Sequence, residues 1–213
     1  MQRRSIRSAL VTLMLLTAVA ATAPAAAGAA PAADLSGTHH YPGAAGLSAA
    51  APYCGITWGS LAKKAQVTNH TTAPITNLRA GRHACFDRLV IDLGPKQMSG
   101  AGQTLGYRVS YVNKVVGIGS GDPVKIAGGA FLSITANAAA HNLDYKPTYS
   151  PKNPLKAVSV AGFSTFRQVA FLGSFEGQTS IAIGVRAKLP MRVQMLAGPG
   201  KGSRLVIDVA HKW

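Results

Sequence analysis

The six residues RLVIDL at 88–93 return almost unchanged as RLVIDV at 204–209, and this repeat decides the fold. Alternate side chains of a β-strand point to opposite sides, so Leu89, Ile91 and Leu93 line one face of the first copy. The arginine, the valine and the aspartate line the other face. Because the second copy alternates in the same way, the repeat predicts two similar strands whose Leu/Ile faces lie in the core of one sheet or of two facing sheets.

Around this repeat, the chain has the composition of a β-protein from residue 53 onward. Short runs rich in β-branched and aromatic residues are separated by Gly, Pro and Asn, and no segment predicts a long helix. The runs expected to be strands are 88–93, 107–112, 124–126, 131–135, 158–160, 168–172, 179–185, 191–196 and 204–209. A short helix is expected at 60–66, and a helical or irregular turn at 136–142. About nine short strands predict an all-β fold, either an antiparallel β-sandwich or a barrel-like sheet.

Residues 1–27 have the pattern of a secretory signal peptide. Three arginines give a positive start, 9–23 are almost wholly apolar, and small residues follow. This apolar run is shorter than the ~20 residues that a membrane-spanning helix needs, although a retained N-terminal anchor is the alternative. We therefore expect cleavage after Ala27, a secreted protein and no membrane span after cleavage.

The next segment, 28–52, consists mainly of Ala, Gly, Pro and Ser, which predicts a flexible linker before a folded domain at 53–213. His39 and His40 lie inside this linker. Dedicated metal sites gather three or four convergent ligands, and two adjacent imidazoles on a loose chain do not, so we expect neither a metal site nor a cofactor.

The chain is strongly basic, with 22 Lys and Arg against 7 Asp and Glu and a formal net charge of +15. Cleavage after Ala27 would remove three arginines and leave nineteen basic residues against seven acidic ones. Glu176 is the only glutamate, and carboxylates this sparse argue against a paired-acid glycosidase or a calcium cage. An excess of positive charge favours anionic partners, although it also keeps an exported protein soluble.

Two cysteines, Cys54 and Cys85, are the only ones in the chain. An even number of cysteines in a protein directed to an oxidising compartment predicts one disulfide between them. A metal site built from His83 and Cys85 is the alternative, but no further ligands accompany the pair.

Several long stretches resemble the AMIN-like domain of exported actinobacterial proteins and lipoproteins. They are YCGITWGSLAKKA at 53–65, GRHACFDRLVIDL at 81–93, GYRVSYV at 106–112, TFRQVAFLGSFEGQTSIAIGVRAKLPMRVQML at 165–196 and GSRLVIDVAHKW at 202–213. The chain is more distantly similar to the AMIN domain, a non-catalytic β-sandwich that directs certain amidases and secretins to the cell wall. The resemblance implies an all-β envelope domain that binds peptidoglycan. The chain lacks the lipobox cysteine of some relatives, which favours release over lipid anchoring.

The motifs of common enzymes do not occur in this sequence. It has no H-E-x-x-H, no G-x-S-x-G, no Walker loop and no C-x-x-C, and its glycine-rich GIGSGD at 117–122 predicts a hairpin turn. A secreted hydrolase would need one of His83, His141 or His211 as a base beside a serine and an acid. Since nothing local brings such groups together, we expect a protein that is not an enzyme.

Two places in the sequence are candidates for ligand contact. The first is the arginine that begins each repeat, which either contacts an anion or forms a weak, solvated pair with an aspartate. The second is the turn around Glu176, where the glutamate either pairs with an arginine such as Arg167 or Arg186 or joins Phe175 and Gln178 in a recognition site. The candidate ligand-binding residues are therefore Arg88, Arg167, Phe175, Glu176, Gln178, Arg186 and Arg204.

These observations favour a secreted, non-catalytic domain that binds peptidoglycan or associated anionic wall polymers. The alternatives are a binder of other polyanions, such as extracellular nucleic acid, and a secreted hydrolase; the sequence has no motif for specific nucleic-acid recognition. The hypothesis requires some of the cations to form a basic face. The candidates for that face are Lys63, Lys64, Arg79, Arg82, Arg108, Lys114, Lys125, Arg167, Arg186, Lys188 and Arg192.

Overall fold

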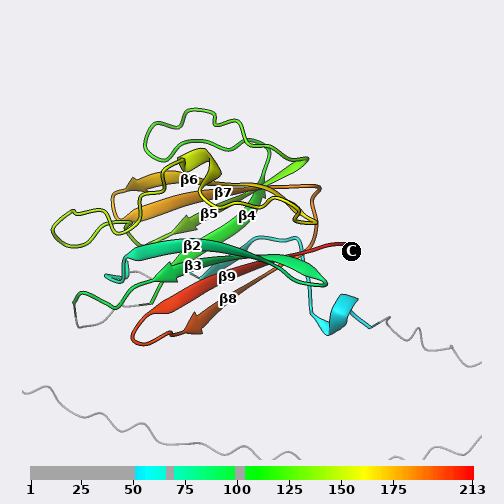
Figure 1. The fold of residues 1–213 in the computed structure, drawn as a ribbon, viewed down its shortest axis with the longest axis horizontal. Coiled ribbons are helices and arrows are strands. Elements are labelled where there is room, and N and C mark those ends of the chain that lie inside the picture. The colour runs from blue at the N-terminus through cyan, green and yellow to red at the C-terminus, as the bar shows by residue number, and fades with distance from the viewer. Residues whose placement is uncertain (1–50, 66–69, 99–103) are drawn as a thin grey trace, which may run out of the picture. The chain divides into compact units, whose positions relative to one another are not determined.

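The fold is an antiparallel β-sandwich of two sheets, seen as two layers in Figure 1. The computed structural model describes residues 51–65, 70–98 and 104–213, so the predicted signal peptide at 1–27 and nearly all of the predicted linker lie outside the described residues. The five-stranded sheet has the order β1 (Lys63–Ala65), β4 (Tyr107–Val112), β5 (Ala130–Ala136), β7 (Gln178–Val185) and β6 (Phe166–Phe175). The four-stranded sheet has the order β2 (Ile75–Arg82), β3 (Phe86–Leu93), β9 (Ser203–Ala210) and β8 (Met191–Ala197).

The two copies of the repeat are β3 and β9, and they pair with each other in the middle of the four-stranded sheet. Leu89 lies opposite Ile207 and Ile91 lies opposite Leu205 in the antiparallel register, so the apolar alternation of both strands falls on one face. That face meets the five-stranded sheet. The core between the sheets includes Ile75, Leu89, Ile91, Val109, Leu132, Ile134, Phe166, Ile181, Ile183, Met191, Leu205 and Ile207.

The predicted all-β sandwich is confirmed, but the predicted strands need four corrections. The runs at 124–126 and 158–160 are not strands, and over 60–65, the described part of the short helix expected at 60–66, the chain forms no helix and enters β1. The strand β2 was not expected, because polar Thr, Asn and Arg interrupt its apolar residues and only Ile75 and Leu78 of its side chains enter the core. The region at 136–142 is irregular after the end of β5.

The two runs that are not strands are apolar because they cover the five-stranded sheet. The segment that contains Ile126 and Ala127 crosses the outer face of β7, where a Cβ atom on Gly184 would overlap the carbonyl oxygen of Ala127. Val158 and Val160 pack against the core beside β6, and Val158 forms a single bridge with Val169. Burial alone therefore accounts for their composition.

The described residues also include two single-turn 3₁₀ helices, η1 (Tyr53–Gly55) and η2 (Pro154–Lys156). Within the described ranges, the structure has no helix that is long and apolar enough to cross a membrane.

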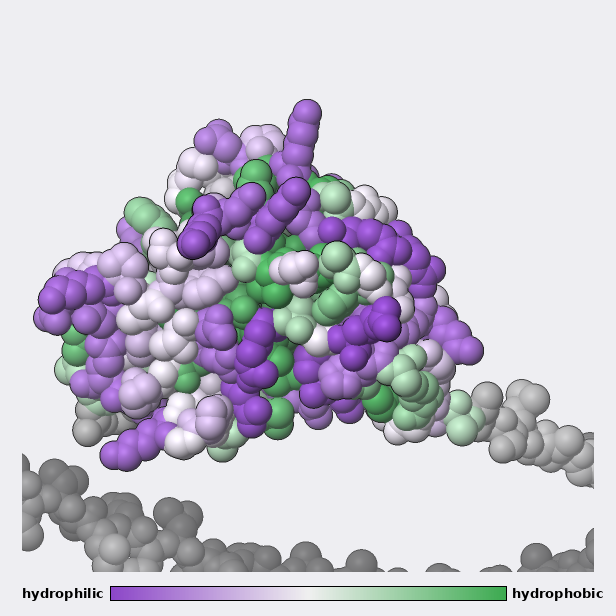
Figure 2. All heavy atoms as spheres, viewed as in Figure 1, coloured by the Kyte–Doolittle hydropathy of each residue, from purple (hydrophilic) through white to green (hydrophobic). Residues whose placement is uncertain are grey.

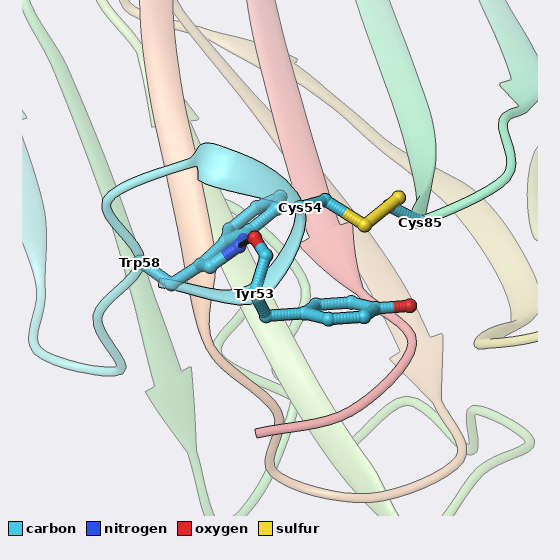
Figure 3. The surroundings of a disulfide bond; sticks show 4 residues. All are labelled: Tyr53, Cys54, Trp58 and Cys85. Carbon is cyan, nitrogen blue, oxygen red and sulfur yellow. Dashed lines mark hydrogen bonds between the residues drawn. A yellow bond between two sulfur atoms is a disulfide. The ribbon is translucent and has the colours of Figure 1, made fainter. Parts of the chain in front are cut away.

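A disulfide joins η1 to the start of β3, as the sequence predicts (Figure 3). Cys54 and Cys85 are 31 positions apart in the chain, with their Cα atoms 6.4 Å apart. The segment after Cys54 is also held locally, because the indole Nε1 of Trp58 donates a hydrogen bond to the carbonyl oxygen of Tyr53 at 2.9 Å. The disulfide thus places the segment with Trp58 next to β3.

We expect the Cys54–Cys85 bond to be present in the purified protein and to stabilise it. Cross-linking a loop of 31 residues removes about 3–4 kcal/mol of conformational freedom from the unfolded chain. Thiol counting on the denatured, non-reduced protein should find no free thiol, and reduction should lower the urea midpoint. A Cys54→Ser/Cys85→Ser double variant should match the reduced protein, and two free thiols in the unreduced protein would contradict the disulfide.

Candidate functional site

The outer face of the four-stranded sheet carries a row of arginines and aspartates that the antiparallel pairing of the repeat creates. Arg88 of β3 lies opposite Asp208 of β9, and Asp92 of β3 lies opposite Arg204 of β9. Each arginine therefore faces the aspartate of the other copy. On the other side of β3, Asn77 of β2 lies opposite Asp92. Arg79, two positions further along β2, reaches the same face.

The strongest ion pairs on this face converge on Asp208. Arg88 donates from Nε and Nη2 to the two oxygens of Asp208 at 2.6 and 2.9 Å. Arg192 of β8 donates from Nη2 and Nε to the Oδ2 atom of Asp208 at 2.7 and 3.2 Å. The Asp208 side chain is 1% exposed, whereas those of Arg88 and Arg192 are 25% and 27% exposed. The expectation of a solvated, weakly paired aspartate is thus wrong for Asp208, because two guanidinium groups cover it.

Aromatic rings flank these two arginines. The guanidinium carbon of Arg88 lies 5.1 Å from the ring centroid of Phe86, and that of Arg192 lies 5.8 Å from the same centroid. Arg192 also lies 5.7 Å from the ring centroid of Trp58, and the Trp58 and Phe86 rings are 5.9 Å apart. We call Trp58, Phe86, Arg88, Arg192 and Asp208 the arginine–aromatic cluster. Cation–π attraction and two hydrogen bonds each to Asp208 hold both arginines in fixed positions.

The arginine–aromatic cluster has more positive than negative charge. Two guanidinium groups share one carboxylate, and the Nη1 atoms of Arg88 and Arg192 have no hydrogen-bond partner among the described residues. Hydrogen bonding to Asp208 raises the pKa of Arg88 above its usual value, against the opposing effect of burial, so this arginine stays charged. Two fixed guanidinium groups with outward N–H donors are suited to a carboxylate or a phosphate group.

The other Arg–Asp position of the repeat, Asp92 opposite Arg204, is organised differently. Asp92 accepts two hydrogen bonds from Arg79, at 2.7 and 2.9 Å, instead of pairing with Arg204. Hydrogen bonding to Asp92 raises the pKa of Arg79, although half of the Arg79 side chain is exposed. This pair fits the expected weak, solvated type. Arg204 donates from Nη2 to the carbonyl oxygen of Ala197 at 3.0 Å, and its buried Nε has no partner among the described residues.

Two of the candidate arginines have backbone partners. Arg167 donates to the carbonyl oxygens of Phe163, Ser164 and Phe166, which ties the loop before β6 to that strand. Arg186 donates to the carbonyl oxygen of His211. Neither arginine pairs with Glu176, so the ion pair that was the alternative for this turn does not form.

Glu176 lies at the tip of the β6–β7 hairpin and is exposed. Its φ of +49° and that of Gly177, +75°, make the left-handed turn that matches the twist of a two-residue hairpin. Phe175 and Gln178 pair across the end of the hairpin, and the Phe175 ring packs toward Gly119 in the neighbouring loop while remaining 52% exposed. The structure places these three residues together at one tip of the five-stranded sheet, whereas Arg88 and Arg204 lie on the four-stranded sheet.

Among the candidate histidines, His211 meets a carboxylate. Its Nε2 atom lies 3.1 Å from Oδ1 of Asp87, and the other oxygen of Asp87 accepts the backbone N–H groups of Thr165 and Phe166 at 2.5 and 3.0 Å. The Asp87 side chain is fully buried, and that of His211 is 16% exposed. Through these hydrogen bonds, Asp87 connects β3 of one sheet to the start of β6 in the other sheet.

The cations proposed to form a basic face lie on both sheets and on the loops between strands. Lys64 of β1 and Arg108 of β4 lie opposite each other in the register of the five-stranded sheet, whereas Arg79 and Arg192 lie on the four-stranded sheet. Figure 2 shows hydrophilic and hydrophobic side chains next to one another over the visible face. The outer face of the four-stranded sheet carries Arg79, Arg88, Arg192 and Arg204 against Asp92 and Asp208, which gives it a charge of +2.

Of the predicted ligand-binding residues, the arginine–aromatic cluster contains Arg88. Sequence reasoning missed Trp58 and Phe86 and placed Arg192 only among the dispersed cations. The predicted disulfide carried a usable signal, since it brings Trp58, four positions after Cys54, next to Phe86, which directly follows Cys85. Arg192 needed the register of β8 on β9, which the sequence does not supply.

One comparison with known proteins identifies a family. Residues 73–211 match the AMIN-like domain family, and this match covers eight of the nine strands and both copies of the repeat. Neither the curated proteins nor the solved structures include a match to the chain. Since the matched residues make up well over half of the chain, the protein belongs to the AMIN-like domain family.

Proposed function

We propose that this protein is a secreted, non-catalytic cell-envelope protein that binds anionic polymers of the cell wall through the arginine–aromatic cluster. An AMIN-like domain is consistent with a cell-wall-related role, and a disulfide is compatible with an extracellular location. The ligand groups would be the carboxylates of peptidoglycan stem peptides or the phosphates of associated wall polymers.

The observation that carries the proposal is the sharing of one buried carboxylate by two guanidinium groups. Asp208 fixes Arg88 and Arg192 by hydrogen bonds from Nε and Nη2 and leaves the Nη1 edges without a partner among the described residues. An incoming anion would meet donors that are already oriented, so it would lose little binding energy to the ordering of side chains.

The surroundings of the cluster also favour an anion on a polymer. The rings of Trp58 and Phe86 lie beside the guanidinium groups and can contact the apolar parts of a sugar or a peptide. The net charge of +2 on this face attracts an anionic polymer over about 8 Å at physiological salt. A ligand can reach the cluster because the side chains of both arginines are partly exposed.

A non-catalytic role is supported by the position of the His211–Asp87 pair, a histidine and a carboxylate of the kind found in catalytic machinery. Asp87 is fully buried, accepts two backbone N–H groups and contacts His211. A general base must reach the proton that it abstracts, whereas Asp87 is fully buried and the Nε2 atom of His211 is directed at it.

The test is retention of the purified protein on isolated cell walls across a salt series. Arg192→Gln removes one guanidinium group while Arg88 still binds Asp208 at both oxygens, so we expect a folded variant whose affinity falls about tenfold. Arg108→Gln, which removes one positive charge from the other sheet, is the matched control and should bind like the parent protein. Binding of the parent protein should weaken as salt rises.

Several outcomes would contradict the proposal. Equal retention of Arg192→Gln and the parent protein would exclude the arginine–aromatic cluster as the binding site. Unchanged retention at high salt and on walls stripped of anionic polymers would exclude charge as the determinant. Tighter binding to nucleic acid than to walls, or cleavage of wall material by the protein, would favour the alternative functions.

A further inference from the structure

We propose a second site, independent of the arginine–aromatic cluster, that binds one ring of a neutral carbohydrate. It is a pocket of about 160 Å³ beside the 141–147 turn, and its walls include Thr71, Gln97, His141, Asn142, Leu143 and Tyr145. We call it the Tyr145 pocket. Pockets for drug-sized ligands measure about 300–1,000 Å³, so this volume suits a single small ring and not a longer segment.

The described lining of the Tyr145 pocket carries no Lys, Arg, Asp or Glu, although the chain has 22 basic residues and 7 acidic ones. A charged group placed there would lose hydration without gaining an opposite charge. The composition of the walls therefore selects a neutral ligand, in contrast to the proposed anion site on the four-stranded sheet.

An exposed aromatic face stands at the edge of the pocket. Tyr145 is 81% exposed, and its ring stacks on His141 with centroids 5.1 Å apart and planes 29° from parallel. Its φ of +58° is left-handed, a conformation that is unfavourable for a bulky side chain and that recurs at binding sites. A flat ring fixed in this way can stack on the apolar face of a sugar.

The turn holds Tyr145 in place through Asn142. The Oδ1 atom of Asn142 accepts the backbone N–H groups of Asp144 and Lys146 at 3.0 and 2.9 Å, and the Tyr145 N–H donates to the Asn142 carbonyl oxygen at 3.0 Å. The Oε1 atom of Gln97 accepts the N–H of Leu143 at 3.0 Å, which anchors the turn to the body of the domain. The aromatic face is thus preorganised before a ligand binds.

The pocket offers one acceptor and one donor group side by side. His141 Nδ1 donates to the Asn142 carbonyl oxygen at 2.8 Å, so in the neutral ring Nε2 is an acceptor, and Nε2 has no partner among the described residues. Because Oδ1 of Asn142 is occupied, its Nδ2 amino group supplies the donors, and no described residue accepts from it. A sugar hydroxyl donates and accepts at once, so this combination matches it better than it matches an anion.

The experiment is a titration of the full chain with chitotriose and, separately, with cellotriose. Two-dimensional NMR of the backbone amides monitors binding. We expect saturable shifts in the 141–146 amides, with an affinity in the millimolar range that does not change with salt. Tyr145→Gly removes the ring and fits the left-handed backbone, so it should fold at least as well and lower the affinity about tenfold. Tyr145→Phe keeps the ring and should retain binding, as should Trp213→Ala, which removes another exposed aromatic residue.

Three results would overturn the Tyr145 pocket as a carbohydrate site. The first is that neither chitotriose nor cellotriose shifts the amides. The second is that Tyr145→Gly and the parent protein bind the sugars with equal affinity. The third is that a neutral tripeptide amide produces shifts and the sugars do not. Arg192→Gln should leave the sugar titration unchanged. This variant separates the two proposals, because the anion site can fail while the Tyr145 pocket binds, and the reverse also holds.

Discussion

Replacing Ile207 with Asp is expected to unfold the domain. Ile207 lies in β9 with no exposed surface, opposite Leu89 in β3 and Val193 in β8, and its side chain points between the two sheets. A carboxylate at this position would be buried without a partner, at a cost of about 3–5 kcal/mol. The loss of the isoleucine contacts adds about 2–5 kcal/mol. Together they approach the whole stability of a typical domain, about 5–15 kcal/mol.

The neighbouring residue provides the matched control. Val206 is also buried, at 2% exposed, but it lies on the outer face and does not belong to the core between the sheets. Val206→Thr should cost about 1 kcal/mol, because the hydroxyl group can reach water between the long side chains of that face. Urea denaturation followed by circular dichroism measures both variants. Equal losses at the two positions would contradict the inner and outer faces assigned to β9.

The repeat makes the same prediction for β3. Ile91→Asp should unfold the domain as Ile207→Asp does, and Val90→Thr should be as mild as Val206→Thr, since each pair occupies equivalent places in the register. This equivalence explains why the sequence was sufficient for the central part of the fold. Alternation with period two, present twice, fixes which side of each strand is buried without knowledge of the neighbouring strands.

Elements outside the repeat depended on contacts that one sequence does not reveal. The apolar side chains of strand β2 are those of Ile75, Leu78 and Ala80, too few to predict a strand, and the strand forms by pairing with β3. The 124–126 run was predicted as a strand because it is apolar. Its apolar residues instead cover Gly184 from outside the sheet, and the sequence pattern of a covering segment does not differ from that of a short strand.

The candidate site was predictable in part for a similar reason. The sequence identified Arg88 as a residue that contacts an anion or an aspartate, but the register decides that its aspartate is Asp208 and that Asp92 is taken by Arg79. The two Arg–Asp positions that the repeat places opposite each other are equivalent in sequence and differ in their environment. Arg88 and Asp208 lie beside Trp58 and Phe86 next to the disulfide, whereas Asp92 and Arg204 lie towards the β8–β9 turn.

Two aspartates of the same strand should differ greatly in their contribution to stability. Asp87 faces the interior at the edge of the sandwich, where it accepts the N–H groups of Thr165 and Phe166 and contacts His211. Asp92 faces outward, with a partner, Arg79, whose side chain is half exposed. The difference follows from their positions in β3, because residues five apart in a strand lie on opposite faces.

We therefore expect Asp87→Ala to cost about 3–5 kcal/mol and Asp92→Ala less than about 1 kcal/mol. The first substitution leaves two buried N–H groups without an acceptor and releases the start of β6 from β3, so it weakens the connection between the two sheets. His211→Ala should have an intermediate effect, because Asp87 keeps both backbone donors. Urea denaturation of the three variants gives the order directly. If Asp87→Ala were as mild as Asp92→Ala, the Asp87 carboxylate would not be what joins the sheets, and the apolar core alone would hold them together.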